Sequence, residues 1–137
     1  MSIQEKKFAA VIESIPTITA WIDEVLESLG ALTKAKMQLD VAVDEIFGNI
    51  SHYAYPDGEG SASVRLEYEE DARMFSVTFT DEGIPFDPLS QKEPDTTLGL
   101  EERQIGGLGI FLVKKTMDDV RYEYRDGKNI LCLKKRI

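Results

Sequence analysis

The spacing of hydrophobic residues predicts two long helices in the first half of the chain. Ser14, followed by Ile15 and Pro16, is typical of a helix N-cap, and Gly30 is typical of the glycine that ends a helix. A second helix is expected from about residue 33 to residue 54. Apolar residues recur at helical intervals in both segments: Ile18, Trp21, Ile22, Val25, Leu26 and Leu29 in the first, and Leu39, Val43, Ile46, Phe47, Ile50 and Ala54 in the second.

Alternation of apolar and polar residues predicts strands further along the chain. Two alternating runs flank the hairpin-like sequence EEDAR: Val64, Leu66 and Tyr68, and then Phe75, Val77 and Phe79. Strands are also expected at residues 4–10, 119–125 and 129–135, the last two joined by a turn at Asp126 and Gly127. A long polar loop, residues 89–106, precedes a helix that begins at a cluster of glycines.

This order of elements predicts an α/β fold. Strand, two helices, two strands, loop, helix and two strands are expected to form a two-layer α/β sandwich, in which helices cover one face of a mixed, mostly antiparallel sheet. The length of 137 residues fits one domain, residues 1–137.

Composition narrows the classes of function. The net charge is -9, and the acidic excess argues against direct binding of nucleic acid, which requires a basic surface. The basic excess after residue 113 is interpreted as solvated charge at a strand end. A single cysteine, Cys132, excludes an internal disulfide and a multi-cysteine metal site, and its position between Leu131 and Leu133 suggests burial. Without a membrane-spanning run or a signal-peptide core, a cytoplasmic location and no membrane association are expected.

Three polar residues share one face of the second predicted helix. Glu45, Asn49 and His52 are spaced i, i+4 and i+7, which places them within about 60° of one another, roughly opposite the apolar stripe. They could simply form the solvated face of an amphipathic helix. However, Gly48 and Asn49 are poor helix formers at a mid-helix position. A glutamate can instead orient or deprotonate a hydroxyl group, and an asparagine oxygen can bind Mg²⁺.

The sequence TFTDEGIPFDP places a carboxylate at a strand exit. Asp81 could accept a hydrogen bond from an exocyclic amine such as that of adenine, and Gly83 would allow a ligand to approach the backbone. Asp81 and Glu82 could equally be ordinary turn acids. Pro85 and Pro88 are expected to stiffen the chain that leaves the strand.

The sequence IGGLGIFLVKK places glycines before an apolar-striped helix. Gly106, Gly107 and Gly109 leave backbone N–H groups accessible at the positive end of the helix, which suits phosphate groups. The alternative is a flexible loop that meets a helix, because the pattern is neither the P-loop nor the dinucleotide fingerprint.

The order of these three motifs resembles the GHKL ATPase superfamily, which has the Bergerat fold, and within it the small bacterial anti-sigma factor serine/threonine kinases. DEIFGNISHYAYP resembles the N-box, DEGIPFDP the first glycine box and GGLGIFLVKK the second. The resemblance covers nearly the whole chain.

The resemblance implies a role for each matching residue. Glu45 is implied as the general base, Asn49 as the Mg²⁺ ligand and Asp81, with Gly83, as the adenine-binding group. The segment of Gly106, Gly107, Leu108, Gly109 and Ile110 is implied as the phosphate loop, and residues 89–106 as the ATP lid. Arg103 matches an arginine near the terminal phosphate or the protein substrate.

Two positions differ from the family pattern. Members often carry a histidine four residues after the asparagine, where this chain has Tyr53, with His52 one position earlier. Members also tend to carry a threonine that contacts the nucleotide in the penultimate strand region, where Asn129 is the nearest polar residue.

The implied function is that of an ATP- and Mg²⁺-dependent serine/threonine protein kinase. It would phosphorylate an anti-sigma antagonist similar to a STAS domain, bind a sigma factor and form a homodimer. Two alternatives remain open: a module of the same fold that senses ATP or ADP without phosphate transfer, and a scaffold that binds no nucleotide.

Overall fold

The computed structural model of the chain describes residues 2–90 and 107–137. The elements are the strands β1 (Ser2–Ala9), β2 (Ser61–Glu69), β3 (Met74–Asp81), β4 (Asp119–Arg125) and β5 (Lys128–Arg136), and the helices α1 (Ile15–Ser28), α2 (Thr33–Tyr53) and α3 (Gly107–Thr116). Short 3₁₀ turns at Ile12–Ser14 and Pro88–Ser90 precede α1 and follow the exit of β3.

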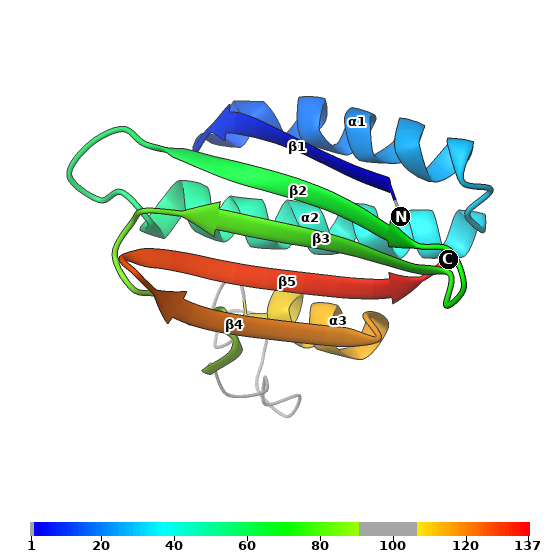
Figure 1. Cartoon of the computed structure of the whole chain (residues 1–137). Coiled ribbons are helices and arrows are strands. Elements are labelled where there is room, and N and C mark those ends of the chain that lie inside the picture. The colour runs from blue at the N-terminus through cyan, green and yellow to red at the C-terminus, as the bar shows by residue number, and fades with distance from the viewer. Residues whose placement is uncertain (1, 91–106) are drawn as a thin grey trace.

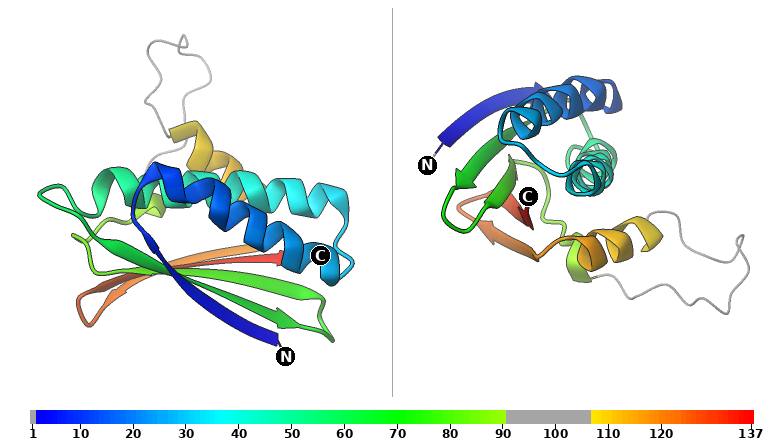
Figure 2. Two further views of the ribbon diagram at one scale, coloured as in Figure 1. Left: turned by 90° about the horizontal axis from the view of Figure 1, so that it is seen from above. Right: turned by 90° about the vertical axis from the view of Figure 1, so that its right-hand side faces the viewer.

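The five strands form one sheet in the order β1-β2-β3-β5-β4, and every neighbouring pair is antiparallel (Figure 1). All three helices lie on the same side of the sheet (Figure 2). The expected two-layer α/β sandwich is therefore confirmed, and the described strands include no parallel pair.

The predicted apolar faces form the core between the two layers. Ile18, Ile22 and Leu26 of α1 and Leu39, Val43 and Phe47 of α2 are completely buried. On the sheet, strict alternation in β3 directs Phe75, Val77 and Phe79 towards the helices. Burying these side chains supplies most of the driving force that keeps the helices on the sheet.

The limits of α1 show one confirmed cap and one that differs. Gly30 has a φ of 73°, its N–H donates to Glu27 O, and the N–H of Ala31 donates to Leu26 O, a Schellman ending. Ser14 occupies the N-cap position but makes no side-chain cap bond. Because the preceding 3₁₀ turn already gives Ser14 helical dihedrals, its hydroxyl instead donates to Ala9 O at 2.8 Å.

Cys132 differs from its expected burial. Leu131 and Leu133 face the core, so the alternation of β5 directs Cys132 to the opposite face of the sheet, where it is only half-buried. When two apolar residues of a strand face the core, the residue between them is therefore expected on the opposite face.

Candidate nucleotide site

Two polar side chains interrupt the apolar inner face of the sheet at one end. Asp81 is the last residue of β3 and Asn129 is the second residue of β5, and the register pairs them directly across the two strands. The same alternation that buries Phe79 and Leu131 directs both inward, leaving them 5% and 6% exposed. Among the residues that the structure describes, Asp81 and Asn129 are the two polar or charged residues that are buried.

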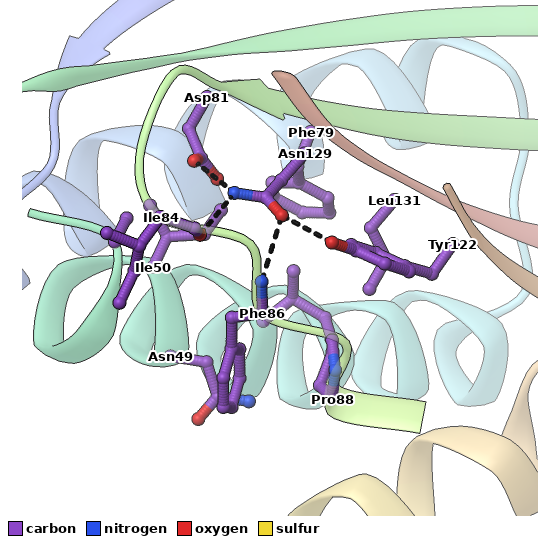
Figure 3. A pocket seen from close by; sticks show the side chains of 12 residues that line it. Asn49, Ile50, Phe79, Asp81, Ile84, Phe86, Pro88, Tyr122, Asn129 and Leu131 are labelled. Carbon is purple, nitrogen blue, oxygen red and sulfur yellow. Dashed lines mark hydrogen bonds between the residues drawn. The ribbon is translucent and has the colours of Figure 1, made fainter. Parts of the chain in front are cut away.

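Hydrogen bonds join this pair to the chain that leaves β3 (Figure 3). Asn129 Nδ2 donates to Asp81 Oδ1 at 2.9 Å and to Ile84 O at 2.8 Å. The Phe86 N–H donates to Asn129 Oδ1 at 3.1 Å, and the Tyr122 hydroxyl donates to the same oxygen. Each polar atom of the buried amide thus has a partner, as burial requires.

The end of α2 holds the strand exit from the other side. The Ile84 N–H donates to Ala54 O at 2.9 Å. A Cβ on Gly83 would lie 2.3 Å from Ala54 O, so only glycine permits this close approach of two backbones. The proline-rich sequence is therefore accompanied by direct backbone contact with the helix.

Tyr55 adds a further link between the same elements. Its hydroxyl donates to Ser61 O at 2.6 Å and accepts from the Glu82 N–H at 2.9 Å. Its ring lies against Gly60, where a Cβ would lie 2.4 Å from ring carbons. One side chain thereby connects the end of α2, the start of β2 and the exit of β3.

A cavity opens between this exit, α2 and β5. It contains about 370 Å³ of empty space, part of it open to solvent. Its lining is apolar apart from a few polar groups that point inward (Figure 3). The lining residues are Ile46, Asn49, Ile50, Ala54, Phe79, Asp81, Ile84, Phe86, Pro88, Tyr122, Asn129 and Leu131.

The acid–amide face of α2 is turned towards the site. Asn49 lines the cavity together with Asp81, and both Glu45 and Asn49 are half-buried. His52 is exposed and does not line the cavity. Tyr53, also exposed, stacks on the cavity residue Phe86 with ring centroids 5.1 Å apart. The interpretation of this face as purely solvated is therefore wrong for Glu45 and Asn49.

The first turn of α3 lies against Glu45. A Cβ on Gly109 would lie 2.2 Å from the Glu45 carboxyl carbon, so a larger residue there would displace the end of the Glu45 side chain. Glu45 Oε1 is buried and has no hydrogen-bond partner within residues 2–90 and 107–137. Burial raises the pKa of Glu45, and the neighbouring Asp44 carboxylate adds to the rise. This combination is typical of a carboxylate prepared for proton transfer or ligand contact.

The glycine-led segment is described in part. Gly107 and Leu108 belong to the first turn of α3, and the Ile110 side chain is in the core, so Ile110 could meet a ligand only through its backbone. Gly106, Arg103 and the lid from residue 91 onward lie outside the described residues. Their roles stay predictions.

Oxygen donors for Mg²⁺ are available at Asn49, but not as a closed metal cage. Among the described residues, no three His, Cys, Asp or Glu side chains gather in a way that could hold a metal ion. A single amide oxygen fits the preference of Mg²⁺ for few protein ligands combined with water and phosphate. Within the same residues, no helix is long and apolar enough to cross a membrane.

Sequence reasoning missed several residues of this site. Tyr55, Phe86 and Tyr122 were not singled out, and Asn129 was considered only as a possible nucleotide contact. Strand alternation and the pairing of β3 with β5 would have directed Asn129 inward beside Asp81. Nothing in the local sequence signals the bonds of Tyr55, because its partners lie in other segments.

A twisted antiparallel sheet under three helices, with an acid at a strand exit and an acid–amide helix facing a glycine-led helix, defines an ATP-binding α/β domain of the Bergerat type. The family described as the histidine kinase-like ATPase domain matches residues 8–135, and the chain belongs to it.

Three of the similar proteins are protein kinases by name. The chain is 27% identical over 113 residues to serine/threonine-protein kinase BtrW of Bordetella bronchiseptica, covering 82% of this chain and 79% of the relative. It is 30% identical over 138 residues to serine-protein kinase RsbW of Bacillus subtilis, covering 95% of this chain and 83% of the relative. It is 32% identical over 100 residues to RsbW of Listeria monocytogenes, covering 70% of this chain but 63% of that relative. The expected resemblance to the anti-sigma kinase group is confirmed, and the predicted enzyme class is that of these relatives.

Proposed function

We propose that residues 1–137 form a single ATP-dependent serine/threonine protein kinase domain that acts as an anti-sigma regulatory factor. The observation that supports this most directly is that Asp81 and Asn49 line one cavity, while Glu45, one turn before Asn49 on α2, lies against the first turn of α3. A nucleotide could extend across this site from base to terminal phosphate.

Asp81 would recognise the adenine base. Its carboxylate is buried and lines an otherwise mostly apolar cavity, so it can accept a hydrogen bond from the exocyclic amine while Ile50 and Phe79 contact the ring. Hydrogen bonds to charged groups in such surroundings contribute about 1.5–3 kcal/mol.

Asn49 and the start of α3 would hold the phosphate groups. When bound, Mg²⁺ would offset phosphate charge, and Asn49 would contribute an amide oxygen to it. The backbone N–H groups of Gly107, Leu108 and Gly109 lie in the first turn of α3, where the helix dipole favours an anion.

Glu45 would orient and deprotonate the hydroxyl of the acceptor serine. Burial raises its pKa, which makes the carboxylate a stronger base than one in water. A buried oxygen without a partner is costly unless a ligand uses it. Glu45 Oε1 has no partner among residues 2–90 and 107–137, so it is the atom assigned to this step.

The protein substrate would be an anti-sigma antagonist similar to a STAS domain, and the chain would also bind a sigma factor as a homodimer in the cytoplasm. The names of the relatives support protein kinase activity, and the acidic net charge is consistent with protein partners rather than nucleic acid. Arg103 and Gly106 would complete the phosphate end.

Nucleotide binding is tested first by thermal unfolding with Mg-ATP. Ligand at about 100 times Kd should stabilise the protein by about 2.7 kcal/mol. Asp81→Asn should abolish this shift, whereas Glu24→Gln, at an exposed position of α1, should not change it. If wild-type protein shows no shift with any adenine nucleotide, the proposed function is wrong.

Phosphate transfer is tested with labelled ATP and a candidate antagonist protein. Glu45→Gln should bind Mg-ATP but lose transfer, by about 100-fold or more if Glu45 is the general base. A wild-type protein that binds ATP but labels no serine-bearing partner would support the alternative, a non-catalytic ATP/ADP-sensing module of the same fold.

A further inference from the structure

The orientation of the Asn129 amide is determined by the backbone. Ile84 O can only accept and the Phe86 N–H can only donate, so Nδ2 must face Ile84 and Oδ1 must face Phe86. Nδ2 is therefore also the atom that faces Asp81 Oδ1, at 2.9 Å. The exit of β3 thus fixes which polar group Asn129 presents to Asp81.

This arrangement uses all the ordinary bonding capacity of Asn129. Its two Nδ2 protons are directed at Asp81 and Ile84, and the two lone pairs of Oδ1 accept from Phe86 and Tyr122. Asn129 has no remaining group for a nucleotide. Its effect on a ligand must therefore act through its neighbours.

The neighbour that matters is Asp81. Its Oδ1 accepts from the Gly83 N–H at 2.8 Å as well as from Asn129, whereas no bond to Oδ2 is found among the described residues. Two donors on Oδ1 fix the rotation of the carboxylate, so Oδ2 is the oxygen left to accept from a ligand in the cavity that Asp81 lines.

We propose that Asn129 is a positioning residue: it holds the Asp81 carboxylate so that this group only accepts hydrogen bonds from the base. The site is thereby selective for 6-amino over 6-oxo purines. The proposal rests on the proposed function, because it assigns a determinant of base choice within that site. With Oδ1 held by two N–H donors, the free carboxylate oxygen accepts from an amine but repels a carbonyl oxygen. A buried polar group left without a suitable partner is the strongest source of such discrimination.

The test compares binding of Mg-ATP and Mg-ITP by titration calorimetry, since inosine carries a 6-oxo group in place of the amine. Asn129→Asp keeps the size and the acceptor for Phe86 but replaces the Nδ2 donor with an oxygen. Cys132→Ser is the matched control, on the same strand but the opposite face of the sheet.

Wild-type protein and Cys132→Ser should both prefer ATP to ITP. Asn129→Asp should weaken ATP binding by about tenfold or more and leave ITP binding nearly unchanged, so the ratio of the two dissociation constants falls. In the transfer assay, KM for ATP should rise with kcat at saturating ATP retained, because Glu45 is untouched. A merely structural role would weaken both nucleotides equally.

An unchanged ratio in a folded Asn129→Asp variant overturns the assignment. If that variant does not fold, Asn129→Ser, which avoids a second buried carboxylate, is measured in the same way and decides by the same ratio. A wild-type protein that binds ATP and ITP equally well refutes this inference alone, whereas one that binds neither nucleotide refutes the proposed function on which it rests.

Discussion

Replacing Asp40 with asparagine should change how stability depends on pH. Asp40 on α2 faces Asp23 on α1, and each has a buried oxygen without a hydrogen-bond partner in residues 2–90 and 107–137. Burial raises the pKa of Asp40 from 3.8 to about 7, followed by the hydrogen bond that a protonated Asp40 can donate to Asp23 and by the charge of Asp23, against a smaller opposing effect of Lys36. Lys36 itself pairs with Glu27 at 2.8 Å.

The sign follows from proton binding. Between about pH 4 and about pH 7, the folded state holds a proton on Asp40 that the unfolded chain has lost, so stability falls as pH rises through this range. The full shift of about 3 pKa units corresponds to about 4 kcal/mol. Because the site is only half-buried and solvent screens the charges, the expected effect is about 1–2 kcal/mol.

Urea unfolding at about pH 5 and about pH 8 measures this effect. Asp40→Asn keeps the shape of the side chain but cannot ionise, so the variant should gain stability over wild type as pH rises. Glu24→Gln, an exposed change on α1, should follow the wild-type curve. If the Asp40→Asn and wild-type curves stay parallel over the whole range, Asp40 does not hold the proton.

Three further substitutions test the contacts around the site. Gly83→Ala should lower stability by about 1–3 kcal/mol, because its Cβ would meet Ala54 O at 2.3 Å; an unchanged Tm would contradict this. Tyr55→Phe should cost about 1–3 kcal/mol in urea unfolding, since two backbone groups lose their shared partner; a loss below about 0.5 kcal/mol would show that water replaces the hydroxyl. Gly109→Ala should remain folded but lose phosphate transfer by about tenfold or more, because the Glu45 carboxylate must move; transfer at the wild-type rate would remove Glu45 from its proposed position.

The helices α1 and α2 and the strands β2 and β3 were predictable because each has a single strong periodicity. The apolar stripes of α1 and α2 and the alternation in β2 and β3 depend only on neighbouring residues, and Gly30 ends α1 as its sequence indicated. Ser14 was harder, because the preceding turn determines its dihedrals and its hydroxyl bonds elsewhere.

The sequence predicted the individual motifs of the site but not how they come together. Glu45, Asn49 and Asp81 stood out by residue type and spacing, yet a solvated helix face and ordinary turn acids fitted them equally well. The deciding facts are tertiary: Gly109 lies against Glu45, and Asn129 pairs with Asp81 across the sheet. Such contacts depend on strand register and helix docking, which a single sequence does not reveal.

The exit of β3 is held through main-chain atoms, and this has a consequence for how the protein can change. Ala54 O binds the amide of Ile84, while Asn129 binds the carbonyl of Ile84 and the amide of Phe86. None of these bonds requires a particular side chain at residue 84 or 86. Both positions can therefore be varied in a mutant library to reshape the cavity wall, while the anchoring that keeps the wall in place is retained.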